Sequence, residues 1–456
     1  KALVHRGAAA DQGAPRRNQA GRHRVKGRLN LFQAAMVRWR EMHPYNAVHV
    51  VTLPQPFDRQ RLEACIRRQL EGLGLTGLML DSRRLRYEWT GGATKAPLSV
   101  LAGGADPRAC VQAEMERQLN LGFPAGGGIE PFRFFAVEDA PVFHLGLAYD
   151  HFVAGGDSIV RLLQRLIEDY YRIVPTGAEQ PRPDLYPPGY RRLFARRVFA
   201  LARGFSSWRH LIASCRRSAR PPYPKDGDGY NGVVFARLAP AESARLAATA
   251  RSWGTTQNDI FLALVLKTLS PQVAERRHAK RRRDLAVGSI VNVRRDFGAR
   301  AAGGFAPLLG SFRVAHPVPD DMPLSELARF VCGETSRIKR RKLYLQTLLA
   351  IGLSGLQWRF LSNEERQAFH AKNYAVWAGV TPLQLNALWP EAKSYPFRVG
   401  YVRAVSTGPL SPLVLALTTL GDVLEIALSF RRAAIDRHRA ESLLANILGH
   451  IRSIAP

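Results

Sequence analysis

The stretch Asp150-His151-Phe152-Val153-Ala154-Gly155-Gly156-Asp157 decides how this chain is interpreted. It follows an apolar run, VFHLGLAY (142–149), and precedes an amphipathic segment, SIVRLLQRLIEDYY (158–171). This order predicts a strand, a glycine-rich turn and a helix. A histidine at the end of a buried strand is held in one direction, and its neutral imidazole can accept a proton near neutral pH. The stretch therefore makes His151 a candidate general base.

The same residues also suit purely structural roles. Gly155 and Gly156 fit a tight turn that needs positive φ, and Asp157 or Ser158 fits the N-cap of the following helix. A single histidine at a strand end is commonly a satisfied core residue. Ser158 beside His151 is a weak candidate for a serine nucleophile, because no G-x-S-x-G motif surrounds it. Taken alone, the stretch leaves these alternatives open.

The stretch resembles the motif His-His-x-x-x-Asp-Gly of the condensation-domain and CoA-dependent acyltransferase superfamily. That superfamily includes peptide-synthetase condensation domains, wax-ester synthase relatives, plant alcohol acyltransferases and chloramphenicol acetyltransferase. Asp150 stands at the first His of the motif, His151 at the second and Gly156 at the Gly. Gly155 stands where the family has Asp, so this chain departs from the pattern at one motif position.

Other segments match the family in the same order, over about residues 28–454. They are LNLFQ (29–33), PYNA (44–47), the runs 49–53 and 57–70, PFRFF (131–135), GTTQNDI (254–260) and SIVNVRR (289–295). The resemblance implies an α/β chain built as α+β two-layer sandwiches. Two chloramphenicol-acetyltransferase-like lobes would enclose an active-site tunnel between them.

Length and composition predict two domains. The 456 residues exceed one ordinary core, and strand and helix patterns alternate on both sides of a proline-rich break. We expect a disordered basic N-terminus (1–27), an N-terminal lobe with the His motif (28–185), a linker (186–228) and a C-terminal lobe (229–456). Because the sequence begins at Lys1 without Met, residues that precede it are also expected.

The linker contains an apolar stripe with helical spacing, and arginines occupy the other faces. The stripe consists of Phe194, Val198, Leu201, Phe205, Trp208, Ile212 and Cys215. An amphipathic connector that packs on the protein itself is one interpretation. A basic interfacial helix at an anionic lipid surface is the other.

The charge balance limits the partners. Lys+Arg number 66 against 37 Asp+Glu, which gives a net charge of +29. The basic clusters at 276–283 and 337–342 contain no recognisable nucleic-acid module, so no specific nucleic-acid partner is expected. An acidic acyl or peptidyl carrier protein, or an anionic membrane surface, would suit this charge.

The cysteines, and the lack of metal, redox and membrane-spanning motifs in the sequence, limit the class of protein further. Four scattered cysteines form no disulfide framework, and no apolar run is long enough to span a membrane. We expect a monomer in the cytoplasm, with a peripheral position at the inner membrane face as the alternative. The sequence has no motif for a metal or a redox group, so no permanently bound cofactor is expected.

The resemblance implies acyl transfer from acyl-CoA or acyl-phosphopantetheine, as co-substrate, to an alcohol or amine. His151 would be the general base, and the Gly156 N–H would donate to the oxyanion. Asp157 would take over the loop-bracing role of the missing motif Asp, with Arg294 or Arg295 as its partner. This activity would belong to secondary metabolite or lipid biosynthesis.

The tunnel would be lined by residues of the His loop, of the strand 289–293 and of a channel-closing crossover at 374–389. The expected lining residues are Asp150, Gly155, Ser158, Asn292, Trp377 and Thr381. Two alternatives stay open. The chain could be a catalytically reduced member that serves as a carrier-protein or ligand-binding scaffold, or a peripheral lipid-binding protein.

Two further elements are predicted near the C-terminus. The runs LVLALTT (413–419) and VLEIALSF (423–430) flank the short turn Leu420-Gly421-Asp422, which predicts a β-hairpin. A final helix is expected to begin at Asp436, with its apolar residues on one face.

Overall fold

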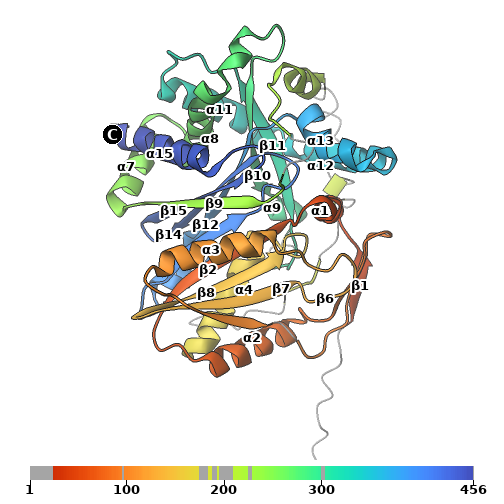
Figure 1. Cartoon of the computed structure of the whole chain (residues 1–456), viewed down its shortest axis with the longest axis vertical. Helices are drawn as coiled ribbons and strands as arrows, with labels where there is room; N and C mark the ends of the chain where they lie inside the picture. The colour runs from red at the N-terminus through yellow and green to blue at the C-terminus, as the bar shows by residue number, and fades with distance from the viewer. Residues whose placement is uncertain are drawn as a thin grey trace, which may run out of the picture.

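A computed structural model shows two stacked lobes, with the N-terminal lobe below and the C-terminal lobe above in Figure 1. The described residues are 24–94, 97–173, 183–186, 190, 193–194, 209–223, 228–298 and 303–454. Each lobe combines a β-sheet with helices, as expected from the alternating strand and helix patterns. The α/β class and the two-lobed arrangement are therefore confirmed.

The N-terminal lobe contains a mixed five-stranded sheet and a smaller four-stranded sheet. The five-stranded sheet has the order β13-β2-β8-β7-β5, and the smaller one has the order β1-β4-β3-β6. Helices α2 and α4 pack on one face of the larger sheet, and α3 packs on the other. The elements are β1 (Val25–Arg28), α1 (Leu31–Met42), β2 (Asn46–Pro54), α2 (Arg59–Leu73), β3 (Leu78–Asp81), β4 (Arg86–Trp89), β5 (Leu98–Ala102), α3 (Pro107–Asn120), β6 (Gly127–Ile129), β7 (Phe132–Asp139), β8 (Val142–Asp150) and α4 (Gly156–Tyr171).

The C-terminal lobe has a six-stranded sheet in the order β11-β10-β12-β14-β15-β9. Helices α8 and α15 pack against it, with α7 and α11 beside α8. The elements of this part of the chain are β9 (Asn231–Leu238), α7 (Pro240–Ser252), α8 (Gln257–Leu269), η1 (Pro271–His278), β10 (Leu285–Asn292), α9 (Arg294–Phe297), β11 (Leu309–His316), α11 (Leu324–Arg340), α12 (Tyr344–Gln357), η2 (Trp358–Phe360), α13 (Asn363–Asn373), β12 (Ala378–Gln384), α14 (Leu385–Leu388), η3 (Pro390–Lys393), β13 (Gly400–Val405), β14 (Leu413–Leu420), β15 (Val423–Arg431) and α15 (Arg437–Ser453). Of these, β13 belongs to the N-terminal sheet.

Side-chain caps fix several helix starts. Asp58, Asp106 and Asp436 each accept a hydrogen bond from the backbone N–H three residues later, at the starts of α2, α3 and α15. Thr256 and Asp259 form a reciprocal capping box at the start of α8. The predicted final helix is thereby confirmed, as is the hairpin of β14 and β15.

The crossover between the lobes lies later in the chain than predicted. The segment 374–389 was expected to close the channel, but β12 within it is a central strand of the C-terminal sheet, parallel to β10 and β14. The strand that crosses is β13, which pairs antiparallel with β2 at the edge of the N-terminal sheet. An apolar run suits a central parallel strand as well as a crossover, which explains the error.

The predicted domain limits need two corrections. Val25–Arg28, placed in the disordered N-terminus or at its boundary, is strand β1 and pairs with β4. The C-terminal lobe does not keep all residues from 229 onward, because β13 belongs to the N-terminal sheet. Of the predicted linker stripe, Val198, Leu201, Phe205 and Trp208 lie outside the described residues. Residues 209–217 are helical, and this helix carries Ile212 and Cys215.

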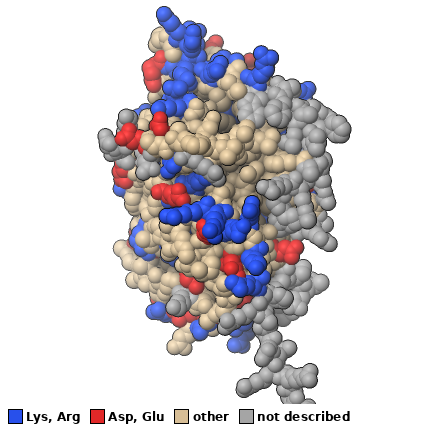
Figure 2. Space-filling view, turned by 90° about the vertical axis from the view of Figure 1, so that its right-hand side faces the viewer, with Lys and Arg blue, Asp and Glu red and all other residues tan. Residues whose placement is uncertain are grey.

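Charged side chains are unevenly distributed on the surface. Figure 2 shows Lys and Arg side chains gathered at the far end of the C-terminal lobe and in a second group near the middle of that face. A few Asp and Glu side chains lie beside the second group. Among the described residues, no helix is long and apolar enough to cross a bilayer.

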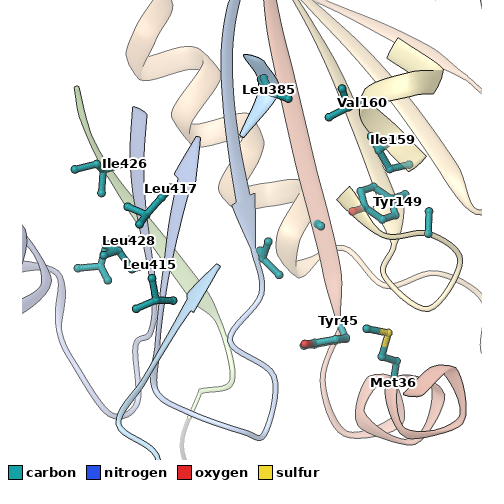
Figure 3. Close-up of a cluster of buried hydrophobic side chains, with 14 of the residues drawn as sticks. Met36, Tyr45, Tyr149, Ile159, Val160, Leu385, Leu415, Leu417, Ile426 and Leu428 are labelled. Atoms are coloured by element: carbon teal, nitrogen blue, oxygen red, sulfur yellow. The ribbon is translucent and has the colours of Figure 1, made fainter. Parts of the chain in front are cut away.

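Buried apolar side chains of both lobes form one large cluster. Figure 3 shows Leu415 and Ile426 of the C-terminal sheet on one side and Tyr149 and Ile159 of the N-terminal lobe on the other. Close packing of such side chains holds the backbone of each sheet nearly fixed. The strand ends at the junction between the lobes are therefore rigid positions for functional groups.

Candidate functional site

The loop that carries His151 is fixed by backbone hydrogen bonds at the end of β8. The His151 N–H donates to the Tyr45 carbonyl at 3.1 Å, and the Val153 N–H donates to the Asp150 carbonyl at 2.9 Å. Gly155 is the N-cap residue of α4, with φ −88° and ψ 161°. The predicted strand, turn and helix are thus present, but neither glycine of this loop has positive φ.

The His151 ring lies between two tyrosines and is almost completely buried. Tyr45 stacks on it with the ring centroids 5.4 Å apart, and Tyr149 meets it edge-on at 5.7 Å. Nδ1 lies 3.3 Å from the Ala154 carbonyl oxygen. A carbonyl can only accept, so Nδ1 carries the proton and Nε2 carries the lone pair.

Burial lowers the pKa of His151 to about 4, and the nearby Arg403 charge acts in the same direction. The ring is therefore neutral at pH 7. Nε2 is then a proton acceptor in nearly every molecule. A neutral histidine with its proton on Nδ1 can accept a proton at Nε2, so in the resting protein it can act as a base but not as an acid.

His151 lies on the wall of a cavity of about 790 Å³ between the lobes. Residues of α1, β2 and the His loop line it from the N-terminal side, and β10, β12, α12 and α13 line it from the other side. Most of the wall is apolar, with Phe32, Trp39 and Leu383 among its members. This size and lining suit an organic substrate that is held away from bulk water.

Asp157 and Arg294 form a buried ion pair behind the His loop. Arg294 Nε donates to Asp157 Oδ2, and Nη2 donates to Oδ1 at 3.1 Å. Asn292 Nδ2 donates to the same carboxylate at 3.1 Å. Arg294 also donates to the carbonyls of Gly304 and Ala306 and to the Ser158 hydroxyl. The expected contact between Asp157 and Arg294 is present, and Asp157 is not the N-cap of α4.

The Asp157 carboxylate occupies the space that a side chain at position 155 would need. A Cβ at position 155 would lie 2.9 Å from Asp157 Oδ1, which is too close for ordinary packing. A Cβ at Gly156 would meet only ordinary contacts with His49 and Leu383. The glycine at the family's Asp position therefore leaves room for the carboxylate that arrives from Asp157.

The structure brings together only part of the predicted site. Gly156, Asp157, Asn292 and Thr381 line the cavity together with His151. The other expected lining residues do not: Asp150, Gly155, Ser158 and Trp377.

Each of these residues has another role in the packing. Asp150 forms a buried ion pair with Arg40, and burial raises the pKa of Asp150 to about 7. Ser158 accepts from Arg294 instead of contacting His151, so it is not poised as a nucleophile. The Trp377 indole N–H donates to the Ala219 carbonyl at 3.1 Å, which turns the side chain away from the cavity.

Arg295 was the alternative partner of Asp157, and this expectation was wrong. Arg295 is exposed, and within the described part of the chain it makes no hydrogen bond or ion pair with Asp157. Consecutive residues of a helical turn point about 100° apart, so only one of the two arginines can face Asp157. The sequence could not decide which one.

Sequence reasoning missed two polar residues of the cavity wall, His49 and Arg403. His49 on β2 lies opposite Arg403 on β13 in the strand register, and His49 Nδ1 is 2.6 Å from the Tyr401 hydroxyl. Burial lowers the pKa of His49 well below its ordinary value. A histidine or an arginine on the apolar side of a strand is itself a signal, because a charged group there needs a partner.

The chemistry available at this site is that of nitrogen bases, hydroxyl groups and backbone N–H groups. Across the described residues, no three His, Cys, Asp or Glu side chains are arranged so that they could hold a metal ion. All four cysteines are free, and burial raises their pKa values. The reactive groups that line this site are therefore the imidazole of His151 and nearby N–H donors.

No protein-family model and no curated protein matches this sequence. Solved structures do match over nearly the whole chain. The first condensation domain of the calcium-dependent antibiotic synthetase, in complex with a substrate analogue, has a TM-score of 0.68 at 16% identity. That match covers 94% of this chain and 96% of that one.

Two further structures show the same similarity. The starter condensation domain of rhizomide synthetase, in complex with C8-CoA, has a TM-score of 0.64 at 14% identity and covers 94% of each chain. The X-domain, solved in complex with OxyB from teicoplanin biosynthesis, has a TM-score of 0.57 at 15% identity. It covers 99% of this chain and 97% of that one. The chain therefore has the fold of the condensation domains.

Proposed function

We propose that the protein transfers an acyl group from a thioester to an alcohol or amine, with His151 as the general base. The observation that carries this proposal is the state of the His151 ring on the cavity wall. Its Nδ1 is bound to the Ala154 carbonyl and its Nε2 is an unprotonated acceptor. The condensation-domain fold supports the same reaction class by resemblance.

In the proposed reaction, His151 Nε2 removes the proton from the acceptor as its oxygen or nitrogen attacks the thioester carbonyl. The carbonyl π electrons move to the oxygen and form a tetrahedral oxyanion. When the oxyanion collapses, the carbon–sulfur bond breaks and the sulfur leaves as a thiol, with the proton returned from His151. The products are an ester or amide and the free thiol, so no oxidant and no covalent enzyme intermediate are needed.

The Gly156 N–H is our candidate donor to the oxyanion. Gly156 is the first residue of α4 and lines the cavity, and a helix N-terminus carries partial positive charge. The described residues provide no acceptor for this N–H. Asp157 and Arg294 would act as positioning residues, since they hold the backbone that presents Gly156 and His151.

The acyl donor would be acyl-CoA or acyl-phosphopantetheine on a carrier protein. A neighbouring structure was solved with C8-CoA, and the net charge of +29 would attract either an acidic carrier or the phosphates of CoA. A monomer in the cytoplasm, expected from the sequence, stays a prediction. The lipid-surface alternative rested on the linker stripe, most of which lies outside the described residues.

The test is thiol release from a panel of acyl-CoA thioesters offered with a primary amine or a primary alcohol, with product identified by mass spectrometry. His151→Ala should lower turnover by about 10²–10⁴-fold, the usual contribution of a general base. Its melting temperature should stay near that of the parent protein, because the ring lies at a cavity wall.

His144→Ala is the matched control. His144 is on the same strand, bonds to Thr52 and Asp139, and is not part of the cavity wall. Its turnover should equal that of the parent. Equal turnover in parent and His151→Ala would contradict the base role. No thiol release from any thioester by a folded protein would favour the scaffold alternative.

A further inference from the structure

Arg403 is a buried arginine on the wall of the proposed substrate cavity. It lies on β13 between Tyr401 and Val405, which project from the same side of the strand, and all three lie at the junction of the lobes. The whole residue is only 4% exposed. It is nevertheless one of the residues that line the cavity beside His151.

Most of the hydrogen-bonding capacity of Arg403 is unused. Only Nη2 donates, to the carbonyls of Thr381 and Leu417 and, at 3.5 Å, to the Thr381 hydroxyl. Nε is buried without a partner. In the described part of the chain, Nη1 donates no hydrogen bond and no carboxylate forms an ion pair with this guanidinium.

The cavity as a whole has an excess of positive charge. Asp157 is the acidic residue of its wall, and that carboxylate is already paired with Arg294. The basic residues of the wall are Arg216, Arg220, Arg282, Lys372 and Arg403. Arg403 is the most deeply buried of these and the one that lies beside the proposed reaction centre.

Other buried arginines of the chain differ from Arg403 in position. Arg276, Arg313 and Arg431 also bond to carbonyls, but none of them lines the cavity. Arg313 uses both terminal nitrogens, with donors directed to Ser214, Ser218 and the Ala375 carbonyl. Arg403 combines a free guanidinium edge with access to the substrate space.

A buried charge is costly unless a partner of opposite sign neutralises it. Arg276, Arg313 and Arg431 also have no carboxylate partner among the described residues, but Arg403 is the one of these four that lines the cavity, where a ligand can reach its guanidinium. A carboxylate fits best, because its two oxygens match the planar pair of N–H donors of a guanidinium. We propose that Arg403 binds a carboxylate group of the substrate. This inference rests on the proposed function and specifies its substrate class.

The carboxylate could belong to either substrate. On the acceptor, it would make the acceptor a free amino acid or hydroxy acid, whose carboxyl group is not tied up in a thioester. On the donor, it would lie at the far end of the acyl chain, as in a dicarboxylic acyl thioester. In both cases a carboxylate would bind Arg403. Turnover with substrate pairs that differ only in this charge shows whether the donor or the acceptor carries it.

Binding is tested first by calorimetry at pH 7, with hexanoate and hexanamide as probes of the same shape. The full chain should bind hexanoate at least about tenfold more tightly than hexanamide, the value of one charge-assisted pair. Arg403→Met should remove this preference, and Arg403→Lys should keep part of it. Arg313→Met, the control, should leave it unchanged.

Three results would overturn the proposal: equal binding of the two probes, no binding of hexanoate, or an equal loss of both probes in Arg403→Met. The last result would make Arg403 a structural tie between the lobes. Binding does not depend on turnover, so a failure of the proposed function would not be mistaken for a failure of this inference.

Turnover then locates the carboxylate. Succinyl-CoA against butyryl-CoA tests the donor, and leucine against leucinamide tests the acceptor. A preference of at least about tenfold for the charged member of one pair, lost in Arg403→Met, is expected. Turnover that ignores the charge in both pairs would keep the acyltransferase function and overturn the role of Arg403.

Discussion

Arg294 and Arg403 are two buried arginines near the His151 loop, and their hydrogen-bonding groups are satisfied very differently. Arg294 donates from all three nitrogens, to the Asp157 carboxylate, to the Ser158 hydroxyl and to two carbonyls. Arg403 donates from one nitrogen to neutral acceptors only. The first arginine completes the fold by itself. The second has an unpartnered Nε and no carboxylate partner among the described residues. This difference is what the proposed carboxylate site on Arg403 rests on.

The sharpest test exchanges each arginine for methionine, which keeps an unbranched stem and removes the charged guanidinium. Arg294→Met leaves the Asp157 carboxylate buried without its partner, which should lower the free energy of unfolding by about 3–5 kcal/mol. Arg403→Met leaves no buried charge behind, so its effect should stay within about 1 kcal/mol. Urea denaturation of both variants measures the contrast.

Asp157→Ala is the companion variant for Arg294→Met. It should cost a similar amount, since it leaves Arg294 as the unpaired charge. A loss of only about 0.5–2 kcal/mol would instead match the removal of a helix cap and would contradict the bracing role of Asp157. Equal losses in Arg294→Met and Arg403→Met would remove the distinction between the two arginines.

Gly155→Asp should be moderately destabilising. The new Cβ would press on Asp157 Oδ1, which lies 2.9 Å from its position, and a second carboxylate would share one arginine. Overpacking of this kind costs about 1–3 kcal/mol. Thermal and urea denaturation provide the measurement.

The double variant Gly155→Asp with Asp157→Gly moves the carboxylate to the family's position. It should recover much of the lost stability if Arg294 can be reached from there. A double variant that is less stable than either single variant would show that only position 157 can supply the brace.

The pH dependence of turnover should show the effect of Arg403 on His151. Burial, with Arg403 adding to it, lowers the pKa of His151 to about 4. The neutral base persists as the pH falls, so kcat/KM should stay level from pH 8 to about pH 5.5 and decline below that. A histidine with the ordinary pKa of about 6.5 would already have lost about tenfold at pH 5.5.

The other groups around the His151 ring are Tyr45, Tyr149 and His49. The tyrosines are already neutral, and burial holds the pKa of His49 well below its ordinary value, so the decline is assigned to His151. Arg403→Met should raise the apparent pKa slightly, and Arg294→Met should not. An inflection near pH 7 that vanishes in Asp150→Asn would belong to Asp150. A decline centred near pH 6.5 in the parent would contradict the lowered pKa of His151.

Local sequence carried much of the prediction. The His loop, the final helix that begins at Asp436 and the C-terminal hairpin each depend on residues within a few positions of one another. Such signals survive without knowledge of the rest of the chain. The motif resemblance then ordered these pieces into two lobes, which the condensation-domain structures match.

The errors share a different cause. The segment around Trp377 is apolar and extended, and this pattern suits a central strand and a crossover equally. β13 has only six residues, and its pairing with β2 joins positions about 350 residues apart. No local rule specifies such a partner, because the energy of pairing is gained only when the two lobes meet.

The sequence by itself determined that a histidine would stand at a strand end, followed by a glycine-rich turn and a helix over about residues 158–171. It also required a carboxylate close to that loop, since Asp157 lies on the first turn of the helix. The tertiary structure decided which arginine pairs with Asp157 and placed Arg403 on the cavity wall without a counter-ion. The physical reason is that strand and helix signals act over a few residues, whereas the neutralisation of a buried charge depends on whichever distant groups the folded lobes bring within a few ångströms.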